Sequence, residues 1–179
     1  MKEHRPPHIY TSDQIYFVTS RTYKDIKYFD DNDKKGLLEK VLKISIEKFN
    51  IAFYAYVILD NHYHLLCRIR NKQDLPKFAQ NLHQNSSRLL RRGLSSATPG
   101  REDIPVWYQY WDKCINSEKD FFVHFNYIHH NPIKHGYKKN LHQLPDYKFS
   151  SYASWLKSHG REFLDNILMD YPISDSYFE

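Results

Sequence analysis

The sequence predicts an α+β protein built on one antiparallel sheet. Runs rich in β-branched and aromatic residues alternate along the chain with segments whose apolar residues recur at helical spacing. Their order is strand, helix, strand, strand, helix, strand, followed by an added helix. The 179 residues, 41% of them apolar, suffice for one domain with a buried core. This βαββαβ order is typical of a ferredoxin-like sheet, in which we expect the first and third strands to be central.

The chain begins with an arm, a strand and a helix. Residues 1–13 contain two prolines and scattered charges without a periodic apolar face, which predicts an extended N-terminal arm. β-branched and aromatic residues at 15–20 predict the first strand. Acidic residues at 31–33 suit the start of a helix over about 34–49, whose apolar side chains recur on one side.

A hairpin follows this helix. Residues 51–59 and 62–70 are both rich in residues that favour strands. Asp60 and Asn61 separate them, and both residue types tolerate the positive φ angles of a two-residue turn. We therefore expect these two strands to be antiparallel neighbours.

The second half of the core repeats the helix and strand pattern. Leucine and phenylalanine at helical spacing predict a helix over 75–92, with Gly93 as its stop. Residues 94–105 are rich in Ser, Gly and Pro, which predicts a loop. The aromatic residues at 107–111 alternate with others as in a strand.

The last predicted helix of the core runs from residue 117 to about 131, where Pro132 makes continuation unfavourable. Beyond it, the only predicted element is a short helix near 151–157. The single domain over 1–179 therefore divides into the N-terminal arm, a catalytic core over about 14–135, and a C-terminal extension over 136–179.

Composition favours an anionic partner inside the cell. The net charge is +5 with a pI near 9.0, and 15 Tyr and 11 His accompany 26 Lys and Arg. Aromatic side chains interleaved with cations suit stacking on unpaired bases beside phosphates. Cys67 and Cys114 lie too far apart in sequence to indicate a disulfide framework. No run has the length of a membrane span and the first residues lack a signal peptide's apolar segment, so we expect a cytoplasmic protein.

Two histidines at the start of one strand form the first candidate site. His62 and His64 are two residues apart, and alternating strand geometry directs both to the same face of the sheet. Tyr63 and Cys67 then point to the opposite face and into the core. Two neutral imidazoles are suitable metal ligands but leave a coordination shell incomplete.

The late helix carries a second candidate site. At about 100° per residue its phenylalanines and Ile128 form a broad apolar face. A narrow stripe nearly opposite contains four polar or aromatic residues, namely Asp120, His124, Tyr127 and Asn131. Tyr127 and Asn131 are four residues apart, so both can meet one ligand. The proline after Asn131 predicts that its backbone is already leaving the helix.

Each of these features also has a purely structural interpretation. A pair of histidines on a strand is more often surface or satisfied core than a metal site, and a tyrosine outside the apolar face is usually half exposed. Trp107 and Trp111 are more often core than platforms for bases. We expect His129, His130 and His135 to be structural or on the surface.

The motifs together resemble a known family. Residues 57–66, VILDNHYHLL, look like the His-hydrophobic-His strand of the HUH single-tyrosine transposases. Residues 127–136, YIHHNPIKHG, resemble their catalytic-tyrosine segment in the form typical of REP-associated tyrosine transposases. Supporting matches are VTSRT at 18–22, VWYQ at 106–109 and YKFSSY at 147–152. Asp60 stands where such proteins more often carry proline, and Tyr63 fills the hydrophobic position between the histidines.

The resemblance implies cleavage and rejoining of single-stranded DNA. Tyr127 is then the nucleophile, and the product is a 5′-phosphotyrosine with a free 3′-hydroxyl. His62, His64 and the amide oxygen of Asn131 are the expected ligands of a divalent cation, Mg²⁺ or Mn²⁺. No nucleotide cofactor is needed, because the phosphotyrosine conserves the energy of the broken bond.

The resemblance also implies hairpin DNA with a short single-stranded tag as the substrate. Contacts to phosphates or bases are expected from six basic residues, namely Arg5, Arg21, Arg88, Arg91, Arg92 and Lys134. We expect a monomer, with a homodimer as the alternative, and no membrane partner.

Two other functions fit parts of the sequence. One is a non-catalytic module that binds single-stranded nucleic acid on an open sheet, with Tyr16, Tyr54 and Tyr56 as stacking platforms. The other is a metal-dependent hydrolase that uses water, in which Tyr127 only orients the substrate. The binding module leaves the shared stripe of Tyr127 and Asn131 unexplained.

Overall fold

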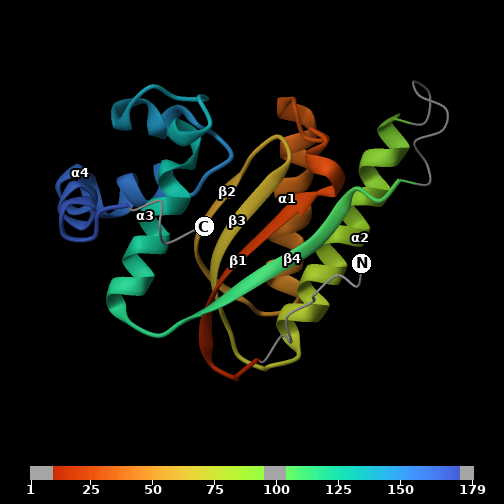
Figure 1. Ribbon diagram of the computed structural model, residues 1–179, viewed down its shortest axis with the longest axis horizontal. Coiled ribbons are helices and arrows are strands. Elements are labelled where there is room, and N and C mark those ends of the chain that lie inside the picture. Colours follow the sequence, from red (N-terminus) through yellow and green to blue (C-terminus); the bar gives the residue numbers. More distant parts are fainter. Residues whose placement is uncertain (1–9, 95–103, 174–179) are drawn as a thin grey trace.

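A four-stranded antiparallel sheet lies between two pairs of helices (Figure 1). The computed structural model describes residues 10–94 and 104–173. Its strands are β1 (Gln14–Thr22), β2 (Ala52–Ile58), β3 (His62–Ile69) and β4 (Trp107–Ile115). Its helices are α1 (Asn32–Lys48), α2 (Asp74–Leu94), α3 (Glu118–Lys134) and α4 (Tyr152–Asp170), with short 3₁₀ turns η1 (Tyr23–Asp25) and η2 (Leu141–Asp146).

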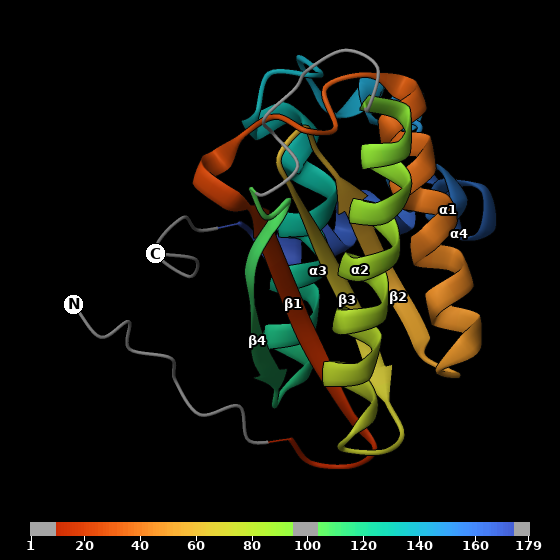
Figure 2. The same cartoon turned by 90° about the vertical axis from the view of Figure 1, so that its right-hand side faces the viewer.

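The strand order confirms the predicted topology. The sheet runs β2-β3-β1-β4, so β1 and β3 are the central strands. β1 pairs antiparallel with both β3 and β4, which brings Thr19 opposite His64 and Arg21 opposite His62. Helices α1 and α2 cover one face, and α3 with α4 lies on the other (Figures 1 and 2).

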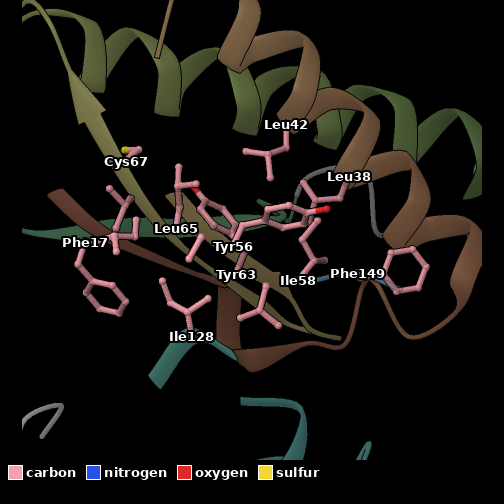
Figure 3. Packing of buried hydrophobic residues seen from close by; sticks show 14 of the residues in the cluster. Phe17, Leu38, Leu42, Tyr56, Ile58, Tyr63, Leu65, Cys67, Ile128 and Phe149 are labelled. Carbon is pink, nitrogen blue, oxygen red and sulfur yellow. The ribbon is translucent and has the colours of Figure 1, made fainter. Parts of the chain in front are cut away.

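Apolar side chains fill both layers between sheet and helices. Tyr63, Leu65 and Cys67 point to the α1 and α2 side and are buried, as alternation along β3 predicts. Figure 3 shows Leu38 and Leu42 of α1 packed on that side, with Phe17 and Ile128 on the other. Each such side chain contributes about 1.5–3 kcal/mol when fully buried.

The hairpin turn at Asp60 and Asn61 has the predicted length but a different backbone. The amide of Leu59 donates to the carbonyl of His62 at 2.8 Å, which closes a two-residue loop. Neither turn residue has the positive φ that the sequence predicts. Tertiary contacts hold the turn instead, because Nζ of buried Lys35 donates to Oδ1 of Asp60 at 2.6 Å.

Two helices extend beyond their predicted ends. α2 includes Gly93 and ends at Leu94, so glycine is not its stop. A helical glycine costs only about 1 kcal/mol, which packing elsewhere on α2 offsets. α3 also continues through Pro132, so the prediction that Asn131 leaves the helix is wrong. The amides of His135 and Gly136 still donate to Asn131 and Ile133 carbonyls at 3.0 Å, which completes the last turn despite the proline.

The C-terminal extension has more structure than its sequence predicts. α4 spans 19 residues instead of a short helix, and Gly160 at φ +83 joins its two helical segments. The extension packs on the edge strand β2, where Nε1 of Trp155 donates to the Tyr54 carbonyl at 2.6 Å. The Tyr147 hydroxyl donates to the Ile58 carbonyl at 2.7 Å. The extension thus covers β2 and α3.

The three tyrosines that the binding-module alternative needs are not open to a ligand. Tyr16 and Tyr56 are buried in the core, and the Tyr54 ring contacts Phe121 of α3 at 5.2 Å between centroids. The prediction of these three stacking platforms is therefore wrong, because the core and α3 cover their rings. Among the described residues, no helix is both long and apolar enough to cross a membrane.

Candidate active site

The two histidines of β3 lie side by side beneath α3. Alternation along the strand directs His62 and His64 to the same face, which confirms the sequence prediction. Their ring centroids are 5.1 Å apart, and both side chains are buried. Burial of two imidazoles on a central strand requires that neighbouring groups satisfy their nitrogens.

Each imidazole is oriented through its Nδ1 atom. Nδ1 of His62 donates to Oδ1 of Asn61 at 2.7 Å, and the Asn61 amide nitrogen in turn donates to the Asp25 carbonyl. Nδ1 of His64 and the Thr19 hydroxyl are hydrogen-bonded at 2.7 Å. With Nδ1 occupied, Nε2 is the nitrogen that each ring has for a ligand.

Burial keeps both imidazoles neutral. Desolvation, with smaller effects from nearby His135 and Arg21, lowers the pKa of His62 to about 3. Desolvation also lowers the pKa of His64 well below its usual value, and the neighbouring His62 adds to this shift. Neutral imidazoles are the form that coordinates a cation.

Tyr127 packs directly on His64, one member of this histidine pair. The residue lies in the middle of α3, whose N-cap Ser117 accepts a hydrogen bond from the Asp120 amide at 3.0 Å. The Tyr127 ring is 5.2 Å from the His64 ring and 6.0 Å from the Phe17 ring, between centroids. Tyr127 is buried at 9% exposure rather than half exposed, because α3 lies flat on the sheet.

The polar stripe of α3 is the side that faces the sheet. His124 is fully buried against Phe17, and Tyr127 against His64. The apolar face is shared between the edge strand β2, where Phe121 contacts Tyr54 at 5.2 Å, and α4, where Phe125 contacts Trp155 at 4.9 Å between centroids. The stripe therefore lies in the core, which the apolar pattern alone does not predict.

Asn131 presents a buried oxygen to the same region. Its side-chain amide nitrogen donates to the Tyr127 carbonyl at 2.7 Å, which directs Oδ1 away from the helix. Among the described residues, Oδ1 of Asn131 and Nε2 of His64 are buried polar atoms without a hydrogen-bond partner. A buried polar atom without a partner costs about 1–3 kcal/mol, so both atoms fit a role as ligands of a cation.

The donors are two imidazole nitrogens and one amide oxygen. This set leaves coordination positions open, which suits Mg²⁺ or Mn²⁺, whereas structural zinc is held by four Cys or His ligands in a closed site. The described residues contain no group of three or more His, Cys, Asp or Glu side chains placed to hold a metal. The proposed ligand set is consistent with this finding, because its third member is the amide of Asn131. Cys67, the nearest thiol in sequence, is on the other face of β3.

Two residues beside the histidines were missed by sequence reasoning. The ring of His135, which follows α3, lies 4.9 Å from the ring of His62 between centroids. The Thr19 hydroxyl orients His64 from the neighbouring strand β1. Both residues belong to strings that resemble the transposase family, which was the only sequence signal for them.

Two of the predicted DNA contacts lie near the histidine pair. Arg21 of β1 lies opposite His62 of β3 in the register of the sheet. The half-exposed Arg21 side chain is 3.5 Å from the Asp25 carboxylate. Nζ of Lys134 lies 5.3 Å from the centroid of the Tyr127 ring. Both cations raise the positive potential around the site.

The three predicted contacts on α2 lie away from the histidine pair. Arg88, Arg91 and Arg92 are on α2, which covers the opposite face of the sheet (Figure 1). Arg91 donates to the Ile104 carbonyl at 2.7 Å, and Arg88 to Oδ1 of Asn85 at 3.2 Å. Arg5 lies outside the described residues.

Known proteins resemble the chain over most of its length. The family described as "Transposase IS200 like" matches residues 10–131. A protein of Haemophilus influenzae, named as a candidate REP-associated tyrosine transposase, is 25% identical over 166 residues that cover 83% of this chain and 85% of the relative. The REP-associated tyrosine transposase of Escherichia coli K12 is 38% identical over 48 residues, 26% of this chain and 27% of that protein.

A solved structure shares the fold. A REP-associated tyrosine transposase bound to a REP hairpin superimposes with a TM-score of 0.69 at 18% identity, over 90% of this chain and 88% of that one. The family match includes both histidines, Tyr127 and Asn131. This chain belongs to the IS200-like transposase family and resembles its REP-associated tyrosine transposases.

Proposed function

We propose that this chain cleaves and rejoins single-stranded DNA through a covalent bond between Tyr127 and a 5′ phosphate. The observation that supports this most directly is the packing of the Tyr127 ring 5.2 Å from the ring of His64, between centroids. Asn131 lies one helical turn further on, with its unpartnered Oδ1 buried. Buried acceptors without partners are costly to a fold, so their presence beside a tyrosine favours a catalytic role.

The proposed reaction is a transesterification. The Tyr127 oxygen forms a bond to phosphorus while the bond from phosphorus to the 3′ oxygen breaks. The phenol loses its proton and the departing 3′ oxygen gains one, so the products are a 5′-phosphotyrosine and a 3′-hydroxyl. Attack by a 3′-hydroxyl of another strand reverses the step and rejoins DNA without a nucleotide cofactor.

The chain supplies positioning and charge for this step. His62, His64 and Asn131 are the residues that would hold a divalent cation, Mg²⁺ or Mn²⁺, through Nε2, Nε2 and Oδ1. Such an ion, when bound, supplies Lewis-acid polarisation of the phosphodiester. Arg21 and Lys134 lie beside the site and attract the anionic backbone of the substrate.

Hairpin DNA is the proposed substrate class. The solved structure that shares this fold is bound to a REP hairpin, which supports a similar partner here. In such a substrate a short single-stranded tag lies next to the duplex stem of the hairpin. The protein can therefore recognise both the tag and the stem. Arg88, Arg91 and Arg92 on α2 stay proposed contacts to DNA away from the histidine pair, and Arg5, outside the described residues, stays a proposed contact as well.

One experiment separates the three functions that the sequence leaves open. The protein is incubated with Mn²⁺ and a labelled oligonucleotide that forms a hairpin with a single-stranded tag, and the products are run on a denaturing protein gel. A labelled band that migrates with the protein supports the covalent mechanism. Free cleaved fragments without such a band support a hydrolase, and intact DNA supports a binding module.

A further inference from the structure

The edge strand β4 contains a bulge opposite Arg21. Thr22 pairs with Trp107 and Ser20 pairs with Tyr110, so Tyr108 and Gln109 together face Arg21 alone. Two residues opposite one is the arrangement of a β-bulge, which bends a strand and redirects its side chains. The bulge therefore changes which β4 side chains share a face.

The bulge brings two aromatic rings together on one face. Tyr108 and Trp111 are three residues apart and would point to opposite faces of a regular strand. Their ring centroids are instead 5.9 Å apart, and Tyr23 of η1 continues the row at 6.5 Å from Tyr108. Tyr108 is 40% exposed and Trp111 is 37% exposed.

The two β4 tryptophans have different environments. Trp107 is buried on the α2 side, where its ring stacks on His83 at 4.8 Å and Phe29 at 5.3 Å between centroids. The prediction that both tryptophans are core residues is correct for Trp107 and wrong for Trp111. Packing of the fold therefore does not account for the exposed ring of Trp111.

This aromatic row lies on the same face as the proposed active site. Trp111 pairs with Thr19, and Thr19 is hydrogen-bonded to His64 in the next strand. Neighbouring strands are about 4.8 Å apart, so the backbones of Trp111 and His64 are separated by about 10 Å. Arg21, opposite the bulge, carries a half-exposed guanidinium beside the row.

We propose that Tyr108 and Trp111 form a stacking platform for unpaired bases of the DNA strand whose phosphate reaches Tyr127. Exposed aromatic rings bind bases of any identity, because every base has a π face. Arg21 pairs with the phosphate backbone of the same strand, which is why the occupant is a nucleic acid rather than an apolar peptide. The identity of the ligand as DNA rests on the function proposed above.

The test compares binding of single-stranded and duplex DNA by fluorescence anisotropy. Trp111→Ala and Tyr108→Ala should each weaken binding of a single-stranded oligonucleotide about tenfold, since one stacked base contributes roughly that factor. Binding of a blunt duplex should change little. Phe53→Ala is the matched control, because Phe53 is 42% exposed on β2 at the other edge of the sheet.

A second measurement needs no destabilising substitution. Oligonucleotide binding to the wild type should quench part of the tryptophan fluorescence, and Trp111→Phe should abolish that part while it keeps most of the affinity. An oligonucleotide with abasic sites should bind more weakly to the wild type and should not quench. Unchanged affinity in both alanine variants, or quenching that persists in Trp111→Phe, would overturn the platform.

The two proposals fail in different ways. Suppose that the wild type forms the covalent band and that Trp111→Ala and Tyr108→Ala bind and cleave DNA as well as the wild type does. The stacking platform is then wrong, and the covalent mechanism stands. If no covalent band forms while the alanine variants lose single-strand affinity, the mechanism is wrong and the platform stands as a binding surface. Equal loss in Phe53→Ala would show a general effect on the sheet and would also overturn the platform.

Discussion

The hydroxyl of Thr19 lies 2.7 Å from Nδ1 of His64, so the imidazole nearest to Tyr127 is oriented from a neighbouring strand. Nε2, the other nitrogen of His64, is buried and has no hydrogen-bond partner among the described residues. A group that fixes the far nitrogen of a histidine also fixes the direction of its free lone pair. We therefore expect Thr19 to act on the proposed reaction through His64.

Thr19→Val should separate this orienting role from packing, because valine has nearly the shape of threonine without the hydroxyl. We expect Mn²⁺ affinity to fall about 10- to 100-fold, measured by electron paramagnetic resonance of free Mn²⁺, with a matching fall in DNA cleavage at limiting metal. Thr19→Ser keeps the hydroxyl and should retain affinity. Equal affinity of the valine variant and the wild type would refute the orienting role.

Tyr127→Phe should abolish the covalent adduct and keep DNA binding. The phenylalanine ring retains the contacts with His64 and Phe17, so the fold should be unchanged. Only the oxygen that forms the bond to phosphorus is lost. The denaturing gel measures the adduct and anisotropy measures the affinity. Cleavage by the phenylalanine variant at the wild-type rate would mean that another group is the nucleophile.

Removal of the divalent cation, or of either imidazole that would hold it, should stop the proposed reaction. In both cases the phosphodiester loses the ion that polarises it. Excess EDTA should eliminate the adduct, and added Mn²⁺ should restore it. His62→Ala and His64→Ala should each lower the cleavage rate by about two orders of magnitude or more, and both should weaken Mn²⁺ binding. His159→Ala, on α4 where the ring stacks on Trp155, is the control histidine substitution. Wild-type activity that survives EDTA would contradict the role of a cation.

Local periodicity was enough to predict much of this arrangement. Alternation along one strand places His62 and His64 on one face whatever surrounds them. Helical spacing likewise puts Tyr127 and Asn131 on one stripe of α3. The strand order also follows from the sequence of elements, and the sheet has that order.

Features that depend on cross-strand register or helix docking were not predictable from the sequence. Thr19 reaches His64 only because β1 and β3 pair in one particular register. His124 and Tyr127 face the central strands because the apolar side of α3 is divided between β2 and α4, and no pattern within α3 contains that information. Tyr108 shares a face with Trp111 because a bulge shifts the register of β4, and a bulge has no fixed sequence signature. Pro132 remains helical because the following amides complete the turn.

The buried ion pair between Lys35 and Asp60 supports the turn that precedes His62. Nζ of Lys35 lies 2.6 Å from Oδ1 of Asp60 and 5.4 Å from the centroid of the Tyr137 ring. Both partners are largely shielded, with side-chain exposures of 6% and 12%. The amide of Phe29 also donates to the Asp60 carbonyl at 2.8 Å, so the turn is held at its backbone and its side chain.

Lys35→Met should therefore lower the free energy of unfolding by about 3–5 kcal/mol, because it leaves the buried Asp60 carboxylate without its main partner. Urea denaturation measures this change. Lys43→Met on the same helix is the matched control, since the Lys43 side chain is 55% exposed and its 3.1 Å pair with Glu39 should contribute at most about 1 kcal/mol. The double variant Lys35→Met with Asp60→Leu should recover much of the loss, because no unpaired charge remains buried. A loss in Lys35→Met no larger than that in Lys43→Met would mean that the pair does not stabilise the turn.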